Sequence, residues 1–381
     1  MKRLLLINSV CGIGSTGRIC LDIAHGYEAN GYDVKIAFGR SDIVGEGAEK
    51  YAVHIGNKFD LYTHALCTRI FDKHGLASIN ATKKFLKWAD EYDPDILWLH
   101  NIHGYYINYE LLFNWIKDRQ RKQSESCKTV MEVKWTLHDC WAFTGHCSHF
   151  AFIGCDKWKD GCKHCPQKRE YPTSSLLDNS ADNYCRKRKA FAGVENLTII
   201  TPSYWMGGLV KQSFLGEYSI EVRHNTVDKN LFKPTHSDFR EKHGIRDDQL
   251  MVLGVSSVWN ARKGLLDYVA LYNKLSDLDS NKYKIVLVGL NDSQIKEMPF
   301  GMICIPKTDS PQLLAGIYTA ADVFVNLTYE DTFPTVNLEA EACGTKVITY
   351  DTGGCIETIL SKDSLTIPTG MIDMIVEKIV E

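Results

Sequence analysis

The chain has 381 residues, which at roughly 150 residues per domain corresponds to about two or three domains. Its 44 lysines and arginines nearly balance its 47 aspartates and glutamates, a formal net charge of −3. This balance argues against a nucleic-acid-binding protein, because phosphate contacts require a basic excess. Hydrophobic residues make up 44% of the chain, enough for full-sized cores. No apolar run approaches the roughly 18 residues of a membrane-spanning helix.

Strands alternate with helices along the first half of the chain, beginning with an apolar run at residues 2–8. The basic start resembles an export signal, but Asn8 and Ser9 interrupt the apolar run after Ile7. We therefore expect a buried first strand and a cytoplasmic protein with reduced thiols. A helix is predicted over residues 16–29, and further strands over residues 33–38, 95–100, 129–137 and 197–202.

The same alternation restarts after residue 225. Strands are predicted over residues 250–256, 284–289, 322–327 and 346–350, and helices over residues 263–276, 311–320, 336–343 and about 355–361. Such alternation is typical of parallel sheets with helices on both faces. We expect two doubly wound α/β domains, residues 1–224 and 225–381, facing each other across a cleft. Ligands of such sheets bind at the carboxyl ends of the strands.

A loop with two acids, a helix and a glycine pair follow the strand at 322–327. Glu330 and Asp331 lie in the loop, and Glu339 lies in the helix that Pro334 opens. Carboxylates accept hydrogen bonds from the hydroxyls of sugar and ribose. The free amides at the start of this helix suit a diphosphate, because unpaired N–H groups and the helix dipole favour anions. These amides belong to Thr335, Val336 and Asn337, and the later tight turn is Gly353-Gly354.

This segment resembles the signature of family 4 glycosyltransferases, the retaining group 1 enzymes of the GT-B fold that use nucleotide-sugar donors. The family pattern is Glu, seven residues, Glu, Ala-x-Ala-x-Gly and a later Gly-Gly. Glu339 and residues 340–344 match its second half. The spacing places the first acid on Asp331, with Glu330 one position early, so both are candidates for that role. The resemblance covers most of residues 200–360 and, more weakly, the N-terminal half.

Arg262 and Lys263 precede Gly264, where a helix is predicted to begin. Cations at this end oppose the helix dipole unless an anion lies between them and the amides. The resemblance implies that Lys263 holds the donor diphosphate. The family's arginine about five residues earlier is absent, because Val258 and Trp259 stand there, so Arg262 is a candidate substitute. The alternative is a solvated helix start.

Histidines follow two of the predicted strands in the N-terminal half. The resemblance implies that His138 contacts the donor sugar and that His100, Asn101 and His103 line the acceptor side. Each histidine has the alternative of an ordinary packed or surface side chain. The predicted catalytic residues are His138, Lys263, Glu330, Asp331 and Glu339. The predicted donor-binding residues are Gly14, Arg262, Lys263, Thr335, Val336, Asn337, Glu339, Gly353 and Gly354.

The loop of Gly12, Gly14 and Gly17 matches the dinucleotide pattern G-x-G-x-x-G after a strand. A Rossmann dehydrogenase also has an acid at the end of its second strand, where this chain has Gly39, Arg40 and Ser41. An NADP-dependent oxidoreductase that uses Arg40 stays an alternative. The resemblance instead implies that Gly14 approaches the donor phosphates.

Five of the 13 cysteines lie between residues 140 and 165. Four of them are spaced by seven, six and two residues, and the final C-x-x-C is typical of half a tetrahedral zinc site. We predict a structural zinc that orders an insertion at about residues 140–170, with free thiols, disulfides or an iron–sulfur cluster as alternatives. The predicted ligands are Cys147, Cys155, Cys162 and Cys165.

Together the motifs predict transfer of a sugar from a nucleotide-diphosphate sugar to an acceptor hydroxyl, with retained configuration and no metal for catalysis. The resemblance implies that the departing phosphate takes the acceptor's proton. It also implies a glycan or lipid-linked acceptor in bacterial capsule, O-antigen or exopolysaccharide assembly. The basic runs at 117–122 and 186–189 fit solvated helices or peripheral contact with the inner face of the cell membrane. A second alternative class is a non-catalytic, zinc-linked binding protein.

Overall fold

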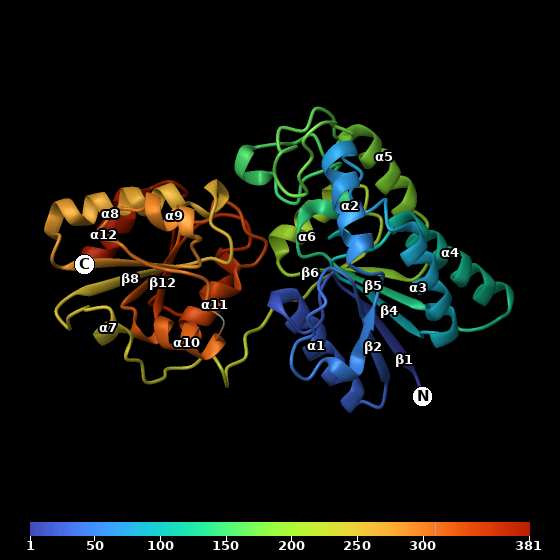
Figure 1. The fold of residues 1–381 in the computed structure, drawn as a ribbon, viewed down its shortest axis with the longest axis horizontal. Helices are drawn as coiled ribbons and strands as arrows, with labels where there is room; N and C mark the ends of the chain where they lie inside the picture. The colour runs from blue at the N-terminus through green and yellow to red at the C-terminus, as the bar shows by residue number, and fades with distance from the viewer. Residues whose placement is uncertain (309) are drawn as a thin grey trace. The chain divides into compact units, whose positions relative to one another are not determined.

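The computed structural model describes residues 1–308 and 310–381, and the chain divides into two units with a parallel sheet each (Figure 1). The first unit contains Met1–Pro202 and Met206–Arg223, and the second contains Ser203–Trp205 and His224–Glu381. The boundary predicted from the sequence, between residues 224 and 225, lies beside this division. No helix of the described residues has the length and apolar character needed to cross a membrane.

The first unit has a seven-stranded sheet in the order β3-β2-β1-β4-β5-β6-β7, with every neighbouring pair parallel. Strand β1 forms because Leu4 to Ile7 are apolar and all fully buried, as expected for a strand covered on both faces. The strands are β1 Arg3–Ile7, β2 Asp33–Phe38, β3 Ala52–His54, β4 Ile96–Leu99, β5 Glu132–Thr136, β6 Leu197–Thr201 and β7 Ser219–Val222.

Helices connect these strands and cover the sheet (Figure 1). Helix α1 packs on β2, and α4 packs between α3 and α5. The helices are α1 Gly14–Ala29, α2 Lys58–Phe71, α3 Ile79–Tyr92, α4 Tyr109–Glu125, α5 Ser180–Phe191 and α6 Tyr204–Gln212. Short 3₁₀ turns lie at η1 Glu49–Tyr51, η2 Cys140–Phe143 and η3 Ala151–Ile153. The segment between η2 and α5 is the predicted cysteine-rich insertion, and it is mostly irregular.

The second unit has a six-stranded parallel sheet in the order β10-β9-β8-β11-β12-β13. The strands are β8 Leu250–Val255, β9 Tyr283–Val288, β10 Ile303–Ile305, β11 Val323–Asn326, β12 Lys346–Tyr350 and β13 Leu365–Ile367. The helices are α7 Phe239–Lys242, α8 Leu265–Asp279, α9 Asp292–Glu297, α10 Pro311–Ala320, α11 Thr335–Ala342 and α12 Ile372–Val380. The 3₁₀ turns are η4 Ala261–Lys263 and η5 Ile356–Thr358.

Successive residues of the second sheet enter two separate cores, because side chains alternate across a strand. Val252 packs with residues of α8 and α12 on one face, whereas Met251 and Leu253 pack with residues of α10 and α11 on the other. Figure 1 shows these helices on opposite sides of β8 and β12. The predicted doubly wound arrangement is therefore correct for this unit.

Two of the predicted helices differ from the structure. The helix expected over 263–276 begins at Leu265, because Gly264 has a left-handed φ of +68° and separates η4 from α8. The helix expected at about 355–361 is only the 3₁₀ turn η5. Ile356 and Leu360 there are 52% and 74% exposed, so a longer helix would have no apolar face to bury.

Candidate functional site

The predicted site residues of the first unit follow three neighbouring strands. The glycine loop follows β1, His100 follows β4 and His138 follows β5, and these strands are adjacent in the order β1-β4-β5. Because the strands are parallel, their carboxyl ends meet at one edge of the sheet. The backbone N–H of Asn101 donates to Asn8 Oδ1 at 3.3 Å and ties two of the loops together. The three loops therefore lie at the same edge of the first sheet.

His100 and His138 form a stacked and hydrogen-bonded pair. His100 Nδ1 lies 3.0 Å from His138 Nε2, and the ring centroids are 5.3 Å apart. Burial lowers the pKa of His138 to about 4 and holds the pKa of His100 well below its usual value. Both imidazoles are therefore neutral near pH 7, and one nitrogen of the pair carries the shared proton.

His103 connects Asp139 to a tyrosine that the sequence did not single out. Its Nε2 lies 3.1 Å from Asp139 Oδ2, and its Nδ1 lies 3.1 Å from the hydroxyl of Tyr171. Burial disfavours a charged Asp139, but the attraction of His103 and the accepted hydrogen bonds outweigh it and hold the pKa of Asp139 well below its ordinary value. Asp139 is thus a carboxylate that fixes the orientation of His103. Tyr171 belongs to the cysteine-rich segment and carries no local motif.

The glycine loop contains two glycines with left-handed backbone and different surroundings. A Cβ on Gly12 would lie 2.8 Å from Ala48 Cβ, so Gly12 is needed for packing. A Cβ on Gly14 would have no atom within 4 Å, so the backbone at Gly14 is open to a ligand. The Arg40 guanidinium lies 5.9 Å from the ring of Tyr105 and 5.5 Å from that of Tyr171. Arg40 therefore already has two aromatic contacts.

In the second unit, the basic turn η4 packs directly against the loop that follows β11. A Cβ on Gly264 would lie 2.0 Å from the carbonyl oxygen of Leu327, so only glycine allows this approach. The N–H of Tyr329 donates to the carbonyl of Arg262 at 2.7 Å. Arg262 and Lys263 are thereby fixed beside the two acids.

The two cations contact the acid loop through different groups. Lys263 Nζ lies 2.5 Å from Asp331 Oδ2, and the two side chains are only 17% and 19% exposed. Arg262 Nη1 donates to the carbonyl oxygen of Glu330 at 2.5 Å. The side chain of Glu330 is fully buried. Lys263 thus pairs with Asp331, the acid that has the family spacing.

Gly353 and Gly354 also pack against the acid loop that follows β11. A Cβ on Gly353 would lie 2.2 Å from the Asp331 carbonyl oxygen, and one on Gly354 would lie 2.1 Å from that of Thr332. The N–H of Gly354 donates to the Asp331 carbonyl at 2.9 Å. Both glycines are therefore required by close backbone packing. Their predicted contact with the donor remains a prediction.

Helix α11 presents its amino end and Glu339 at the same edge. Pro334 stands at the N-cap position and makes no side-chain capping bond, so it does not compete for the first-turn amides of Thr335 and Val336. Glu339 accepts hydrogen bonds from the hydroxyls of Tyr318 at 3.0 Å and Thr335 at 3.4 Å. The side chain of Asn337 is buried between Asn326 and Thr358, and its N–H donates to the Pro334 carbonyl at 3.2 Å. The predicted free amide is therefore absent at Asn337, whose N–H closes the first turn instead.

The segment that holds these loops matches a known family. Residues 236–381 match the model described as glycosyl transferases group 1. This match confirms the resemblance seen in the sequence over the matched residues, which are called the group 1 domain below. They include every residue of the predicted donor-binding list except Gly14.

Individual relatives extend the comparison. The chain is 32% identical over 99 residues to a putative colanic acid biosynthesis glycosyl transferase, WcaC, of Escherichia coli K12. That match covers 26% of this chain and 22% of WcaC, and the matches to curated relatives span less than half of those proteins. Sucrose-phosphate synthase of Thermosynechococcus elongatus has a similar structure, with 15% identity and a TM-score of 0.66 over 100% of this chain and 89% of that chain.

A third relative is HepE of Anabaena, solved in complex with UDP, with 17% identity and a TM-score of 0.60 over 100% of this chain and 89% of that chain. These structural likenesses, together with the two parallel sheets, show the predicted GT-B fold. The group 1 domain is its second Rossmann-like half.

All four predicted zinc ligands line one small hollow of about 10 Å³ in the cysteine-rich segment. The cysteines of the chain are free thiols. Within the described residues, no set of three or more His, Cys, Asp or Glu side chains is arranged so that it could hold a metal ion. The four cysteines therefore line one hollow without forming a ready-made metal site, and zinc stays a prediction.

A hollow of about 880 Å³ lies on the opposite edge of the first sheet from the predicted site. It is lined by residues at the amino ends of strands, such as Lys2, Asp95 and Asn196. Ligands of parallel α/β sheets bind at the carboxyl ends instead. At that end, His100, His103, His138 and Asp139 line a hollow of only about 10 Å³. The size of a hollow therefore does not identify the site here.

Asp267 of the group 1 domain is another residue that the motifs did not indicate. Its Oδ2 accepts hydrogen bonds from the hydroxyls of Tyr329 at 2.8 Å and Tyr350 at 2.6 Å. Asp267 thereby links α8 to the loop after β11 and to β12. The three residues are far apart in the sequence, so no local pattern could have shown this contact.

Proposed function

We propose that this protein is a retaining glycosyltransferase that moves a sugar from a nucleotide-diphosphate sugar to an acceptor hydroxyl. The observation that carries the proposal is the basic pair Arg262–Lys263, held against Asp331 within residues that match the group 1 family. The UDP complex of HepE, a protein of similar fold, supports a nucleotide donor. The name of WcaC supports a role in bacterial polysaccharide assembly.

The donor diphosphate takes the place of Asp331 as the partner of Lys263. A diphosphate carries more negative charge than one carboxylate, so the ammonium turns to it when the donor binds. Arg262 and the first-turn amides of Thr335 and Val336 add positive potential at the same point. These groups stabilise the charge that develops on the departing diphosphate, the role that Mg²⁺ has in other enzymes. We assign no metal cofactor to this step.

Glu339 and Asp331 bind the two sugar rings of the donor. Glu339 accepts hydrogen bonds from the ribose hydroxyls, and Tyr318 holds it in position from the side of α10. Asp331, released by Lys263, accepts hydrogen bonds from the transferred sugar. Glu330 supports the loop from its buried position. The base and the sugar of the donor are not specified by these contacts.

The first unit contributes the acceptor side and one contact to the donor. The open backbone at Gly14 approaches the donor phosphates, and His138, neutral near pH 7, hydrogen-bonds the donor sugar. His100, Asn101 and His103 orient the acceptor side. The departing phosphate accepts the proton of the acceptor hydroxyl, so transfer with retention requires no protein base.

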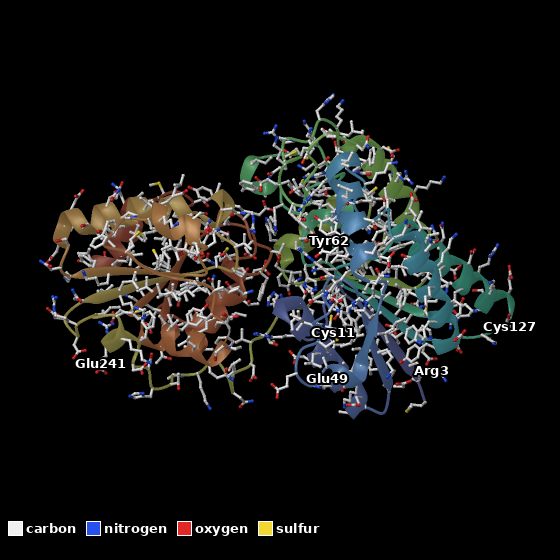
Figure 2. All side chains as sticks on the ribbon, viewed as in Figure 1. Arg3, Cys11, Glu49, Tyr62, Cys127 and Glu241 are labelled. Carbon is white, nitrogen blue, oxygen red and sulfur yellow. The ribbon has the colours of Figure 1, made fainter. Side chains whose placement is uncertain are left out.

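A hollow beside α2 suits a lipid-linked acceptor at the inner face of the cell membrane. It measures about 480 Å³ and combines apolar side chains with two guanidinium groups. Tyr62 and Leu66 on α2 are 69% and 57% exposed, and Figure 2 labels Tyr62 on this helix. Apolar side chains beside arginines match a phosphate attached to a lipid chain. The lining residues are Arg40, Leu61, Tyr62, Ala65, Leu66, Arg69 and Tyr105.

The two basic runs contribute less to membrane contact than their sequence suggested. Arg119 pairs with Asp93, Arg186 pairs with Glu110 at 2.8 Å, and Lys187 is buried. Their charges are thus partly neutralised within the unit. The solvated-helix interpretation fits Arg186, whose side chain is 36% exposed, but not Arg119, whose side chain is only 11% exposed.

A thermal-shift panel tests the class and the donor base together. UDP-, GDP- and ADP-sugars and NADP are compared, and one nucleotide sugar is expected to raise the melting temperature. Replacing Lys263 with Ala is expected to abolish that shift and to lower kcat/KM for transfer by about 10²- to 10³-fold, the usual cost of removing one charge-stabilising group. The control is Lys274→Ala, which removes an exposed ion pair with Asp373 instead.

Stabilisation by NADP alone would reverse the assignment in favour of an oxidoreductase. Unchanged product formation by the Lys263→Ala variant would refute the diphosphate role of Lys263. Absence of any transfer with all three sugar nucleotides and a lipid-linked glycan would favour a binding protein.

A further inference from the structure

The cysteine-rich segment places four cysteines around one small hollow of the first unit. Cys147 is buried, and Cys155, Cys162 and Cys165 are partly buried. All four line the same hollow, closed by the apolar side chains of Phe150 and Trp158. The aromatic rings of Phe143, Phe150 and Trp158 pack on one another with centroids 5.0–6.1 Å apart. Four thiols gathered in a small, aromatic-lined hollow form a site that the glycosyltransferase function does not explain.

Specific contacts bring the sulfurs together. The side chains of Cys147 and Cys165 lie close enough to act on each other's charge. Cys162 Sγ accepts a hydrogen bond from the backbone N–H of Gly145 at 3.1 Å. A Cβ at position 145 would lie 2.6 Å from Cys162 Cβ, so this contact requires glycine. Backbone N–H groups aimed at sulfur stabilise the thiolate form, which is the form that binds metals.

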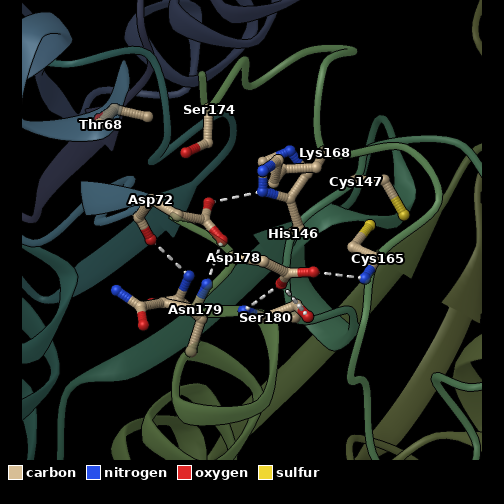
Figure 3. Close-up of polar contacts among 12 residues, drawn as sticks. Thr68, Asp72, His146, Cys147, Cys165, Lys168, Ser174, Asp178, Asn179 and Ser180 are labelled. Atoms are coloured by element: carbon tan, nitrogen blue, oxygen red, sulfur yellow. Dashed lines mark hydrogen bonds and ion pairs between the residues drawn. The ribbon is translucent and has the colours of Figure 1, made fainter. Parts of the chain in front are cut away.

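The turn between Cys162 and Cys165 is fixed on both sides. Lys157 Nζ donates to the carbonyl oxygens of Lys163 at 3.1 Å and His164 at 2.8 Å. The N–H of Cys165 donates to Asp178 Oδ2 at 2.7 Å, and Figure 3 shows Asp178 also bound to Ser180 at the start of α5. The C-x-x-C turn is therefore anchored to a helix rather than left as a loose loop.

A buried cation faces this hollow. Lys187 is only 1% exposed, and its Nζ donates to the carbonyl oxygens of Trp141 at 2.6 Å and Thr144 at 3.0 Å. None of the ion pairs found among the described residues includes Lys187, and the groups that act on its charge are, strongest first, Cys162, Cys147, Asp72 and Asp139. A buried ammonium without a negative partner in direct contact is costly. Negative charge on the sulfurs would supply that partner.

We propose that Cys147, Cys155, Cys162 and Cys165 bind one structural zinc ion. Four S–H protons leave to solvent, four Zn–S bonds form, and no electron is transferred. The complex of Zn²⁺ with four thiolates has a net charge of 2 − 4 = −2, which Lys187 partly neutralises. In a tetrahedral site with Zn–S bonds of about 2.3 Å, the sulfurs are about 3.8 Å apart, comparable to a hydrogen-bonded thiol pair. The ion draws the remaining sulfurs to this spacing, because metal binding and ordering of the ligands are coupled.

The zinc connects the segment to the acceptor side of the first unit. The same segment carries Tyr171, whose hydroxyl contacts His103, and His146, whose Nδ1 lies 2.5 Å from the buried Asp72 on the end of α2 (Figure 3). Loss of the ion loosens both contacts. The inference rests on the thiols and Lys187 alone, so its test does not depend on the proposed transfer activity.

Elemental analysis of the full-length protein, purified with reductant and without chelator, tests the proposal. About one zinc per chain is expected for the wild type. Cobalt replacing zinc is expected to give the intense thiolate-to-cobalt charge-transfer absorption of a sulfur-rich site. Titration with a thiol reagent under native conditions is expected to find four more reactive thiols after chelation than before.

Variants identify the ligands. Cys162→Ser and Cys165→Ser are expected to lose most of the zinc, whereas Cys127→Ser and Cys185→Ser retain it. Cys127 and Cys185 are exposed, and Figure 2 places Cys127 at the far end of α4. Should the ligand variants not fold, the wild-type zinc and cobalt measurements still decide. Less than about 0.2 zinc per chain with no cobalt absorption after reduction and reconstitution would overturn the proposal. Iron with visible absorption, or a disulfide between Cys147 and Cys165, would overturn it too.

Discussion

Lys263 and Asp331 show how one side-chain contact can serve two states of the site. The pair is 68 residues apart in sequence and is only 17% and 19% exposed. In the ligand-free protein the carboxylate compensates the ammonium, which would otherwise be a partly buried lone charge. In the proposed mechanism, a bound diphosphate replaces this carboxylate, which then faces the sugar. Glu330 cannot take this part, because its side chain is fully buried and the Arg262 contact is to its backbone.

The two neighbouring acids should therefore respond differently to neutralisation. We expect Asp331→Asn to lower kcat/KM by about 10²-fold, because it removes a group that faces the donor, and to lower the melting temperature because it leaves Lys263 without its partner. We expect Glu330→Gln to lower the melting temperature with a much smaller loss of kcat/KM, because it alters a buried, partnered carboxylate that does not face the donor. Steady-state kinetics and thermal denaturation of both variants measure the difference. A Glu330→Gln enzyme that is stable but inactive would show that Glu330 is the first acid.

Short glycine-dependent contacts position the loops of the group 1 domain. Gly264, Gly353 and Gly354 each approach a backbone carbonyl so closely that a Cβ would lie 2.0–2.2 Å from its oxygen. These contacts hold the basic turn, the acid loop and the loop after β12 against one another. The geometry of the site is thus set by backbone packing, and the charged side chains are added to a rigid frame.

Gly264 and Gly244 form a matched pair that tests this frame. Both have a left-handed backbone, with φ of +68° and +64°, but a Cβ at 264 meets Leu327 whereas one at 244 has no atom within 4 Å. We expect Gly244→Ala to cost only the backbone strain of about 1–2 kcal/mol. Gly264→Ala should cost several kcal/mol more and abolish donor binding. Denaturant titration and nucleotide binding of the two variants measure this, and equal costs would contradict the role of the close approach.

The sequence predicted the strands of both sheets better than the helices. Apolar runs such as 2–8 and 322–327 correspond to buried strands, because burial on both faces leaves a continuous signal. Helices α2 and α3 were missed, and so were the short edge strands β3, β7, β10 and β13, because none of them contains a long continuous apolar run. The donor-side residues could be predicted because the family motif is local. The contacts of Tyr171, Lys187 and Asp267 were missed, because each joins segments that are distant in the sequence and have no motif.

At the scale of the whole molecule, the two units differ in their titratable groups and in the ligand they are proposed to bind. The first unit contains buried histidines whose pKa values lie below the ordinary 6.5, with His64 at about 3 and His138 at about 4, both because burial disfavours the charged ring. The second unit contains the Lys263–Asp331 pair and the group 1 match. We therefore expect low pH to destabilise the first unit and a bound nucleotide to stabilise the second unit.

We expect two transitions in calorimetry of the full chain. The unfolded chain protonates these histidines near pH 6.5, whereas the folded chain does so only at about pH 3 to 4. Their contribution to stability is therefore complete above pH 6.5 and is lost as the pH falls, at about 1.4 kcal/mol per pKa unit for each group. Acidification to about pH 4.5 should lower one transition, and the stabilising nucleotide should raise the other.

The Gly264→Ala variant identifies the second transition, because that substitution lies in the group 1 domain. A single transition that responds to both acid and nucleotide would contradict the independence of the two units. A nucleotide shift confined to the acid-sensitive transition would move the donor site to the first unit.

Strand β1 lies in the middle of the first sheet although it is synthesised before the other strands of that sheet. Its pairing partner β4 begins at Ile96, so the ribosome adds the 88 residues between Ile7 and Ile96 before one edge of β1 can be covered. At about 5–20 residues per second, this edge of β1 stays unpaired for roughly 4–18 seconds. During that time Leu4 to Ile7, which the native sheet shields entirely from water, stay accessible on the nascent chain. We therefore expect the nascent chain to be bound by chaperones that recognise short apolar segments as they leave the ribosome.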